Sequence, residues 1–379
     1  MTTPRENLLK TLRCQDADWI PVCLGLNPNE HPTKEIPDKL TDVFDPKNLT
    51  WGDSVENTRL MLKLGDYLDA EDYMVPVSPP AHLESKVCFT RNEELNPNQT
   101  ATILSTPEGD LRQVTTFCDN APSLVTERYV KTAEDAVRLT AYFDSLRVET
   151  LPEKVNDVRA IKSQIGDRGV LFCRTEGTPL GMCYRIFSDL TDLIYLIADA
   201  PSVIEALFES MENKHFRICE RMLRETPEID AFFGMDDTST TLISPSMFER
   251  FNGELTNRRA DLCHRYGKLY LHHSCGLIKD LLPIYLKTRM DGVDAFTPPP
   301  IGNVTIPEGR ALLGPRYSLR SGALSKVPSF EEDAMHRHIE QFMTDARKAR
   351  HIILSVGGAH LTFPALERIF KTAQNMKRN

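Results

Sequence analysis

The segment Leu271-His-His-Ser-Cys-Gly276 carries the residue types and the spacing best suited to chemistry in this chain. His273 and Cys275 stand two positions apart on a strand-like run, where side chains at i and i+2 project to the same side. Imidazole nitrogen and thiolate sulfur are ligands that zinc prefers, and a zinc site usually needs three or four ligands. The pair therefore predicts part of a metal site, although Ser-Cys-Gly is also a common strand exit. His272 points the other way and is expected to be structural.

Carboxylates and one further histidine could assist this pair, and each also has an ordinary structural explanation. Asp236 and Asp237 follow another strand-like run. A carboxylate there can orient a substrate or a ligand histidine, but it can equally cap a loop or pair with an arginine. Glu176 is similar, since carboxylates at such strand ends bind metal or act as bases. His360 follows two glycines and could serve a site or simply face solvent.

These candidates lie at the ends of runs in a repeated strand-then-helix pattern. Such alternation implies a parallel sheet flanked by helices. Eight such strands predict an α/β fold, the (β/α)8 TIM barrel, in which function sits at the carboxyl ends of the strands. A doubly wound open sheet is the alternative, but no G-x-G-x-x-G turn follows a candidate strand and no Walker-type loop occurs. The eight predicted strands are 19–25, 72–77, 169–174, 231–236, 268–273, 292–297, 317–322 and 352–356.

The remaining segments predict helices and one excursion from the barrel. Thr3-Pro4-Arg5-Glu6 has the pattern of a capping box, which predicts a helix near the start of the chain. Residues 85–130 are polar, with short alternating runs around Thr106-Pro-Glu-Gly-Asp110, and predict a hairpin excursion. We expect one domain over 1–379 that contains this excursion. Further helices are expected at 132–147, 152–165, 201–224 and 244–267, and Ser329-Phe-Glu-Glu332 predicts another capping box.

Composition excludes several classes of protein. The 379 residues include 54 Asp and Glu against 45 Lys and Arg, a net charge of −9. Binding to duplex nucleic acid needs clustered basic residues, so nucleic acid is not an expected partner. The apolar run Leu193–Ala198 is far shorter than the roughly 20 residues of a membrane span. We therefore expect a cytoplasmic protein with no membrane partner, whose nine cysteines are reduced and mostly packed as small hydrophobic residues.

Several segments, taken in order, resemble the uroporphyrinogen decarboxylase superfamily, and within it the cobamide-dependent methyltransferases. Each segment is loosely similar alone, and the ordered set is more specific. The similar segments are Thr3-Pro-Arg-Glu-Asn-Leu-Leu9, Asp18-Trp-Ile-Pro-Val22, Thr106-Pro-Glu-Gly-Asp-Leu111, Val130-Lys-Thr-Ala-Glu-Asp135, Glu176-Gly-Thr-Pro-Leu180, Asp236-Asp237 with Ser244-Pro-Ser-Met-Phe248, and Leu271-His-His-Ser-Cys-Gly276.

The resemblance implies that His273 and Cys275 bind zinc together with a later cysteine beside the last strand of the barrel. This chain departs from the pattern there. The matching stretch reads Ser355-Val-Gly-Gly-Ala-His360, with glycine at the position of that cysteine, and no cysteine follows Cys275. The third ligand would then be another group, and His360, Glu176 and Asp237 are the candidates in that order.

The activity implied by the resemblance is corrinoid-dependent methyl transfer. A methyl group would move between a small methylated substrate, such as a methyl ether, or a thiol, and the cobalt of a corrinoid protein, with zinc as Lewis acid. Asp236, Asp237 and Glu176 would be catalytic: either aspartate would orient the substrate or a ligand histidine, and Glu176 would be a metal ligand or general acid. No D-x-H-x-x-G signature occurs, so the corrinoid would come on a separate partner protein. The sequence does not identify the residues that would bind the corrinoid.

Two other functions stay open at this point. One is a decarboxylase-like lyase, but the segment Cys23–Glu30 lacks the arginines that bind a polycarboxylated tetrapyrrole. The other is a binding member of the fold that has lost its chemistry. A homodimer is expected only by analogy with the decarboxylases.

Overall fold

The computed structural model describes residues 1–24, 34–45, 47–48, 54–118, 121–321, 332–357 and 362–378. Contacts divide the chain into two compact units. The first comprises Met1–Pro80, Pro152–Thr175 and Glu225–Asn379, and the second comprises Ala81–Leu151 and Glu176–Arg224. Of the candidate catalytic residues, Asp236 and Asp237 therefore belong to the first unit, and Glu176 belongs to the second.

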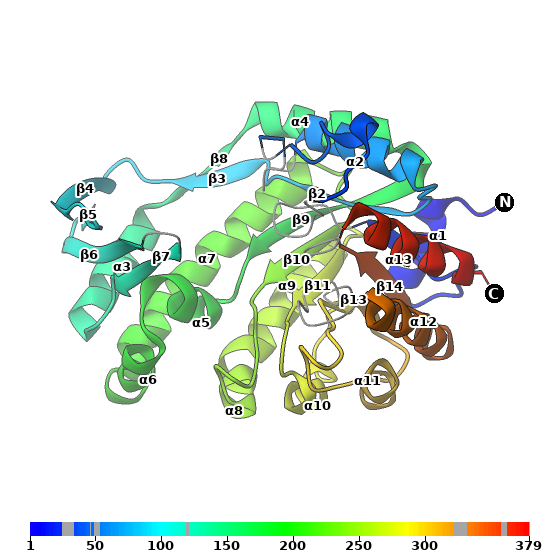
Figure 1. Ribbon diagram of the computed structural model, residues 1–379. Helices are drawn as coiled ribbons and strands as arrows, with labels where there is room; N and C mark the ends of the chain where they lie inside the picture. The colour runs from blue at the N-terminus through cyan, green and yellow to red at the C-terminus, as the bar shows by residue number, and fades with distance from the viewer. Residues whose placement is uncertain are drawn as a thin grey trace. The chain divides into compact units, whose positions relative to one another are not determined.

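The first unit is built on one eight-stranded sheet whose strands run in parallel, and the chain has the predicted (β/α)8 barrel fold (Figure 1). Strand order follows chain order around the sheet. An isolated parallel bridge between Cys23 and Asp72 links the two end strands and nearly closes the barrel. Around the sheet, the strands are β1 (Val22–Leu24), β14 (Ile352–Val356), β13 (Ser318–Ser321), β12 (Gly292–Asp294), β11 (Leu269–His273), β10 (Ala231–Met235), β9 (Gly169–Glu176) and β2 (Tyr73–Val77).

The inside of the barrel is filled by apolar side chains from alternate positions of the strands. The rings of Phe172 and Phe233 stack within this core, with their centroids 4.4 Å apart. Helix α1 (Pro4–Leu12) begins with the predicted capping box and adds Leu8 and Leu12 to the same core. Because its Arg5 contacts Asp230 and the carbonyl of Gly169, this helix lies at the amino ends of β9 and β10. The carboxyl ends of the strands are therefore at the opposite end of the barrel.

Helices of the first unit alternate with its strands, as the sequence predicts. The expected helix over 244–267 is divided into α8 (Pro245–Phe248), a π-helical turn over Glu249–Gly253, and α9 (Glu254–Arg265). The residues Ser329-Phe-Glu of the second predicted capping box lie outside the described residues. The other α-helices of this unit are α2 (Val55–Tyr67), α4 (Pro152–Ile165), α10 (Leu282–Tyr285), α11 (Ile306–Leu313), α12 (Glu332–Ala349) and α13 (Phe363–Met376).

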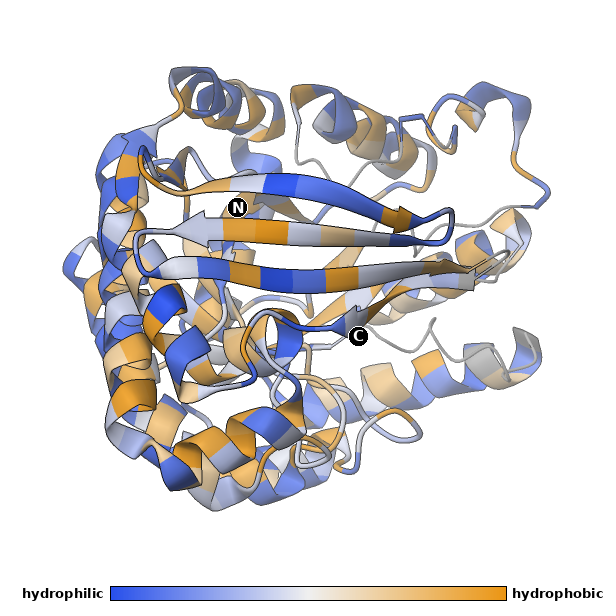
Figure 2. Ribbon diagram, turned by 90° about the vertical axis from the view of Figure 1, so that its left-hand side faces the viewer, coloured by the Kyte–Doolittle hydropathy of each residue, from blue (hydrophilic) through white to orange (hydrophobic). Residues whose placement is uncertain are grey.

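The second unit contains the predicted excursion. Its four-stranded antiparallel sheet faces the viewer in Figure 2 and consists of β4 (Phe89–Asn96), β5 (Gln99–Thr106), β6 (Gly109–Cys118) and β7 (Ala121–Glu127). The tight hairpin between β5 and β6 falls at Pro107 and Glu108, where the sequence predicts it. The unit also holds β3 (Ala81–Glu84) paired with β8 (Arg147–Thr150), and the helices α3 (Ala133–Ser145), α5 (Pro179–Met182), α6 (Leu190–Asp199) and most of α7 (Pro201–Glu225).

Two expectations from composition bear on the described part of the chain. Each helix described there is too short or too polar to cross a lipid bilayer. Six of the nine cysteines are buried, as expected for thiols that pack like small hydrophobic residues.

Candidate metal site

Two neighbouring strands bring the candidate ligands to one place. In the parallel register of β10 and β11, Met235 lies beside His273, so the chain segments that leave the two strands start side by side. Asp237 follows β10 by two residues, and Cys275 follows β11 by two residues. Asp237 has a φ of +49°, a left-handed conformation that costs an ordinary residue about 1 kcal/mol or more. This turn in the backbone re-aims the side chain that follows the strand.

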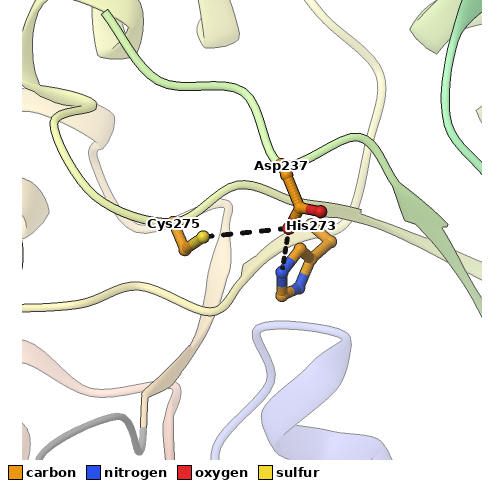
Figure 3. A group of neighbouring side chains, drawn as sticks. All are labelled: Asp237, His273 and Cys275. Carbon is orange, nitrogen blue, oxygen red and sulfur yellow. Dashed lines mark hydrogen bonds and ion pairs between the residues drawn. The ribbon is translucent and has the colours of Figure 1, made fainter. Parts of the chain in front are cut away.

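Asp237, His273 and Cys275 form a group whose ligand atoms all lie within 4.8 Å of one another (Figure 3). Oδ1 of Asp237 is 2.9 Å from Nε2 of His273 and 3.8 Å from Sγ of Cys275. Ligands of a tetrahedral zinc ion at bond lengths of about 2.0–2.3 Å are separated by about 3.3–3.8 Å. The three side chains are half-buried, and their donor set of N, S and O is one that zinc accepts.

Asp294 holds the other nitrogen of the histidine ring. Nδ1 of His273 donates to Oδ2 of Asp294 at 2.7 Å, and Arg320 donates to Oδ1 of the same carboxylate at 2.5 Å. A second hydrogen bond of Arg320, 3.1 Å long, runs to the hydroxyl of Ser355. A carboxylate that accepts from one ring nitrogen fixes the tautomer and leaves the other nitrogen free to bind a metal. Here that other nitrogen is Nε2, which faces Asp237.

Electrostatics favour the charged forms of His273 and Asp294. Burial alone would lower the pKa of His273, but the hydrogen bonds to Asp237 and Asp294 outweigh it and hold the pKa well above its usual value. Burial would raise the pKa of Asp294, yet the charge of Arg320 and the hydrogen bond from His273 lower it well below its usual range. The raised pKa favours the imidazolium form of His273, whose ring lies between the carboxylates of Asp237 and Asp294. A metal ion would have to displace the proton on Nε2.

Asp236 is placed differently from its neighbour Asp237. Its side chain is 1% exposed, and its carboxylate accepts a hydrogen bond of 2.6 Å from the buried amide of Asn252. The same carboxylate lies 3.8 Å from Nε2 of His272. Asp236 is therefore part of a buried polar network with Asn252 and His272, next to the candidate ligands in the chain.

His272 belongs to that network and has the structural position that the strand pattern predicts. It is fully buried, Phe248 packs edge-on against its ring, and burial lowers its pKa to about 4, so the ring is neutral. Its Nε2 lies 3.0 Å from the hydroxyl of Thr238. Thr238 in turn contacts Ser274, the residue between His273 and Cys275.

The two remaining predicted site residues are Glu176 and His360. Glu176 ends β9, is exposed, and falls in the second unit. His360 lies outside the described residues. Of the three candidates for a third ligand, the structure thus brings Asp237, the last in the predicted order, to the histidine and the cysteine.

Sequence reasoning missed Asp294 and Arg320. Both are charged residues inside predicted strands, at 292–297 and 317–322, where a buried parallel strand is normally apolar. A charged residue in an otherwise apolar strand was the signal in the sequence that could have pointed to Asp294 and Arg320. It could not say that the two side chains pair with each other, because β12 and β13 are separated by α11 in the chain.

Comparison with known proteins supports the fold. No family model and no curated protein matches the sequence. The solved structure of a methyltransferase from Methanosarcina mazei is similar over 99% of this chain and 99% of that chain, with a TM-score of 0.62 and 13% identity. At that identity the likeness shows a shared fold.

Two further solved structures have lower TM-scores. A D-psicose 3-epimerase has a TM-score of 0.36 and 12% identity over 64% of this chain and 84% of that chain. The β-glycosidase of the hyperthermophile Thermosphaera aggregans has a TM-score of 0.35 and 10% identity over 94% of this chain and 96% of that chain. Both scores are too low to bear on function.

Proposed function

We propose that this chain is a zinc-dependent methyltransferase that moves a methyl group between a small molecule and the cobalt of a corrinoid protein. The observation that carries the proposal is the convergence of Asp237, His273 and Cys275 at the carboxyl ends of two barrel strands. Support also comes from the end-to-end likeness in fold to the methyltransferase of Methanosarcina mazei. The corrinoid protein as partner follows from the family resemblance of the sequence.

The donor set fits a catalytic zinc site. Three protein ligands leave a fourth position for substrate, which is typical of catalytic rather than structural zinc. One thiolate from Cys275 and one carboxylate from Asp237 balance the charge of Zn²⁺. When bound, zinc would supply Lewis-acid chemistry, polarising the oxygen of a methyl ether or lowering the pKa of a thiol.

The chain's own residues would prepare the site for this chemistry. Asp294 holds the proton on Nδ1 of His273, so that Nε2 is the nitrogen presented to a metal. Arg320 balances the buried charge of Asp294. With Asp237 in place of the family's second cysteine, the site has one thiolate instead of two. Because a carboxylate is a harder ligand than a thiolate, we favour an oxygen donor, such as a methyl ether, over a thiol.

Metal analysis tests the zinc proposal directly. The purified chain should hold close to one zinc per molecule, and Cys275→Ala should lose it. Cys118→Ala is the matched control, because Cys118 is exposed and lies in the second unit. Equal, near-zero zinc in all three proteins would remove the metal mechanism.

Methyl transfer is tested separately. The zinc-loaded chain is mixed with cob(I)alamin and a series of small methyl ethers, and methylcobalamin is followed by its absorbance. We expect methylcobalamin with at least one ether and none with Cys275→Ala. Zinc binding without transfer from any ether or methyl thioether would leave a metal-binding protein of another function.

A further inference from the structure

We propose that Ser274, together with Thr238 and Tyr285, is a positioning element for the metal ligands. It sets the distance between two segments: the one after β10, which bears Asp237, and the one at the end of β11, which bears His273 and Cys275. This inference rests on the proposed zinc site, since it assigns the residues that hold that site in shape. None of the three residues touches the metal position by itself. Ser274 and Thr238 act through the backbone of the ligand residues next to them in the chain, and Tyr285 acts through the hydroxyl of Ser274.

Buried positioning residues and half-buried ligands alternate along both segments. Ser274 lies between His273 and Cys275, and Thr238 follows Asp237. Ser274 and Thr238 are both fully buried, whereas Cys275, His273 and Asp237 are half-buried. The ligand side chains therefore face the open side of each segment, while the hydroxyls between them face the interior.

The hydroxyl of Ser274 joins the two segments directly. Its Oγ donates to the carbonyl oxygen of Thr238 at 2.7 Å and accepts from the hydroxyl of Thr238 at 3.0 Å. Its second acceptor position takes a hydrogen bond of 2.8 Å from the phenol of Tyr285, the last residue of α10. One donor and two acceptor positions are all that a serine hydroxyl offers, so Ser274 is saturated.

The rest of the network supplies one consistent direction for every proton. Nε2 of His272 lies 3.0 Å from the hydroxyl of Thr238 and is placed to donate to it, since the proton of that hydroxyl is given to Ser274. Protons then run from His272 to Thr238, from Thr238 and Tyr285 to Ser274, and from Ser274 to the Thr238 carbonyl. The hydroxyls of Ser274, Thr238 and Tyr285 are all hydrogen-bonded, and buried hydroxyls joined in this way hold a single arrangement.

Backbone contacts outside the network tie the segment after β11 to β12 and to the segment after β10. The amide of Ser274 donates to the carbonyl of Asp294 at 2.5 Å, and the amide of Thr240 donates to the carbonyl of Leu277 at 2.9 Å. The ring of Phe248 packs against both His272 and Tyr285, with centroid distances of 5.6 and 5.3 Å. Water is thereby kept from hydroxyls whose hydrogen bonds define the separation of the segments.

A metal site needs its ligands within about 0.5 Å of the productive geometry, and loss of an outer partner commonly costs about 10–100-fold in metal affinity. Thr238→Val keeps the shape of the side chain and removes the hydroxyl. We expect it to weaken zinc binding about 10–100-fold and to change the visible spectrum of the Co²⁺-substituted protein. Thr238→Ser keeps the hydroxyl and should restore both.

Controls separate positioning from general loss of stability. Thr11→Val removes another fully buried hydroxyl, which donates to the carbonyl of Asn7 within α1 at the other end of the barrel. It should leave zinc affinity and the Co²⁺ spectrum unchanged. If Thr238→Val does not fold, Tyr285→Phe replaces it, with Tyr73→Phe as its control, because Tyr73 is also a buried phenol of the barrel.

Hydrogen exchange in the metal-free protein makes the result independent of the zinc proposal. Amides of residues 272–278 should exchange faster in Thr238→Val than in wild type or Thr11→Val. If wild type binds no zinc, faster exchange in this segment alone still supports the positioning role, while the proposed metal function fails. If wild type binds zinc, wild-type affinity and wild-type exchange in Thr238→Val would overturn the inference and leave the zinc site standing.

Discussion

Asp294 accepts a hydrogen bond of 2.7 Å from Nδ1 of His273, and this contact turns Nε2 of the ring toward Asp237 and Cys275. A carboxylate in this position makes the imidazole a better metal ligand and fixes its orientation. Asp294→Asn keeps the size of the side chain but loses its charge. We expect zinc affinity to fall by about tenfold or more, measured by competition with a chelator.

A matched control for that substitution is Asp261→Asn. Asp261 is an exposed carboxylate that Arg289 holds at 2.7 Å, on the surface of α9. The Asp261→Asn protein should bind zinc with the affinity of wild type. If Asp294→Asn and Asp261→Asn bind zinc equally well, the role assigned to Asp294 is wrong.

The identity of the third ligand gives a second prediction. Asp237→Ala should lose bound zinc, because its carboxylate is the group that lies beside His273 and Cys275. Glu176→Ala and His360→Ala should keep it, and inductively coupled plasma mass spectrometry of the three purified variants decides among them. Loss of zinc in either of the latter two, with zinc retained in Asp237→Ala, would contradict the proposed ligand set.

Stability of the barrel should depend on one buried ion pair near its amino end. Nζ of Lys377 lies 3.1 Å from Oδ2 of Asp72, and the two side chains are 1% and 0% exposed. Removing one partner of a buried pair leaves an uncompensated charge, so Lys377→Met should lower the free energy of unfolding by about 3 kcal/mol. Lys287→Met, which breaks an exposed pair with Glu249, should cost less than about 1 kcal/mol in the same urea titration.

Asp72 also predicts a dependence on pH. Burial raises the pKa of this carboxyl, and the contact with Lys377 only partly offsets the effect. A group whose pKa is raised on folding contributes most below its unfolded pKa, about 3.9, and loses that contribution as pH rises through the folded pKa. The free energy of unfolding of wild type, relative to Asp72→Asn, should therefore fall as the pH rises above about 4. A difference that stays constant or grows over this range would show that the pKa of Asp72 is not raised.

The periodicity of apolar residues and the spacing of strand-like and helix-like segments predict the barrel well, because both depend on local properties of each segment. All eight expected strands are present, with ends shifted by up to three residues, and the capping box at Thr3 begins α1 as expected. The two-residue spacing of His273 and Cys275 likewise places both side chains in one group. These features depend on alternation within a strand and on caps within a few residues.

Local sequence patterns could not predict which residues of different strands contact one another. The contact of Ser274 with Thr238 depends on the register of β10 against β11, and no local pattern encodes that register. The left-handed backbone at Asp237 depends on the turn that follows β10, so Asp237 ranked behind His360 and Glu176 from sequence alone. The second unit combines residues 81–151 with 176–224, a long-range association that exceeds the predicted excursion at 85–130.

Zinc K-edge X-ray absorption of the zinc-loaded protein tests the central claim most directly. The proposed site should show one sulfur at about 2.3 Å, from Cys275, and nitrogen or oxygen neighbours at about 2.0–2.2 Å, from His273, Asp237 and one exchangeable ligand. In Cys275→Ala the sulfur shell should vanish. A first shell that contains no sulfur in the wild-type protein, or that contains two, would contradict the site formed by Asp237, His273 and Cys275.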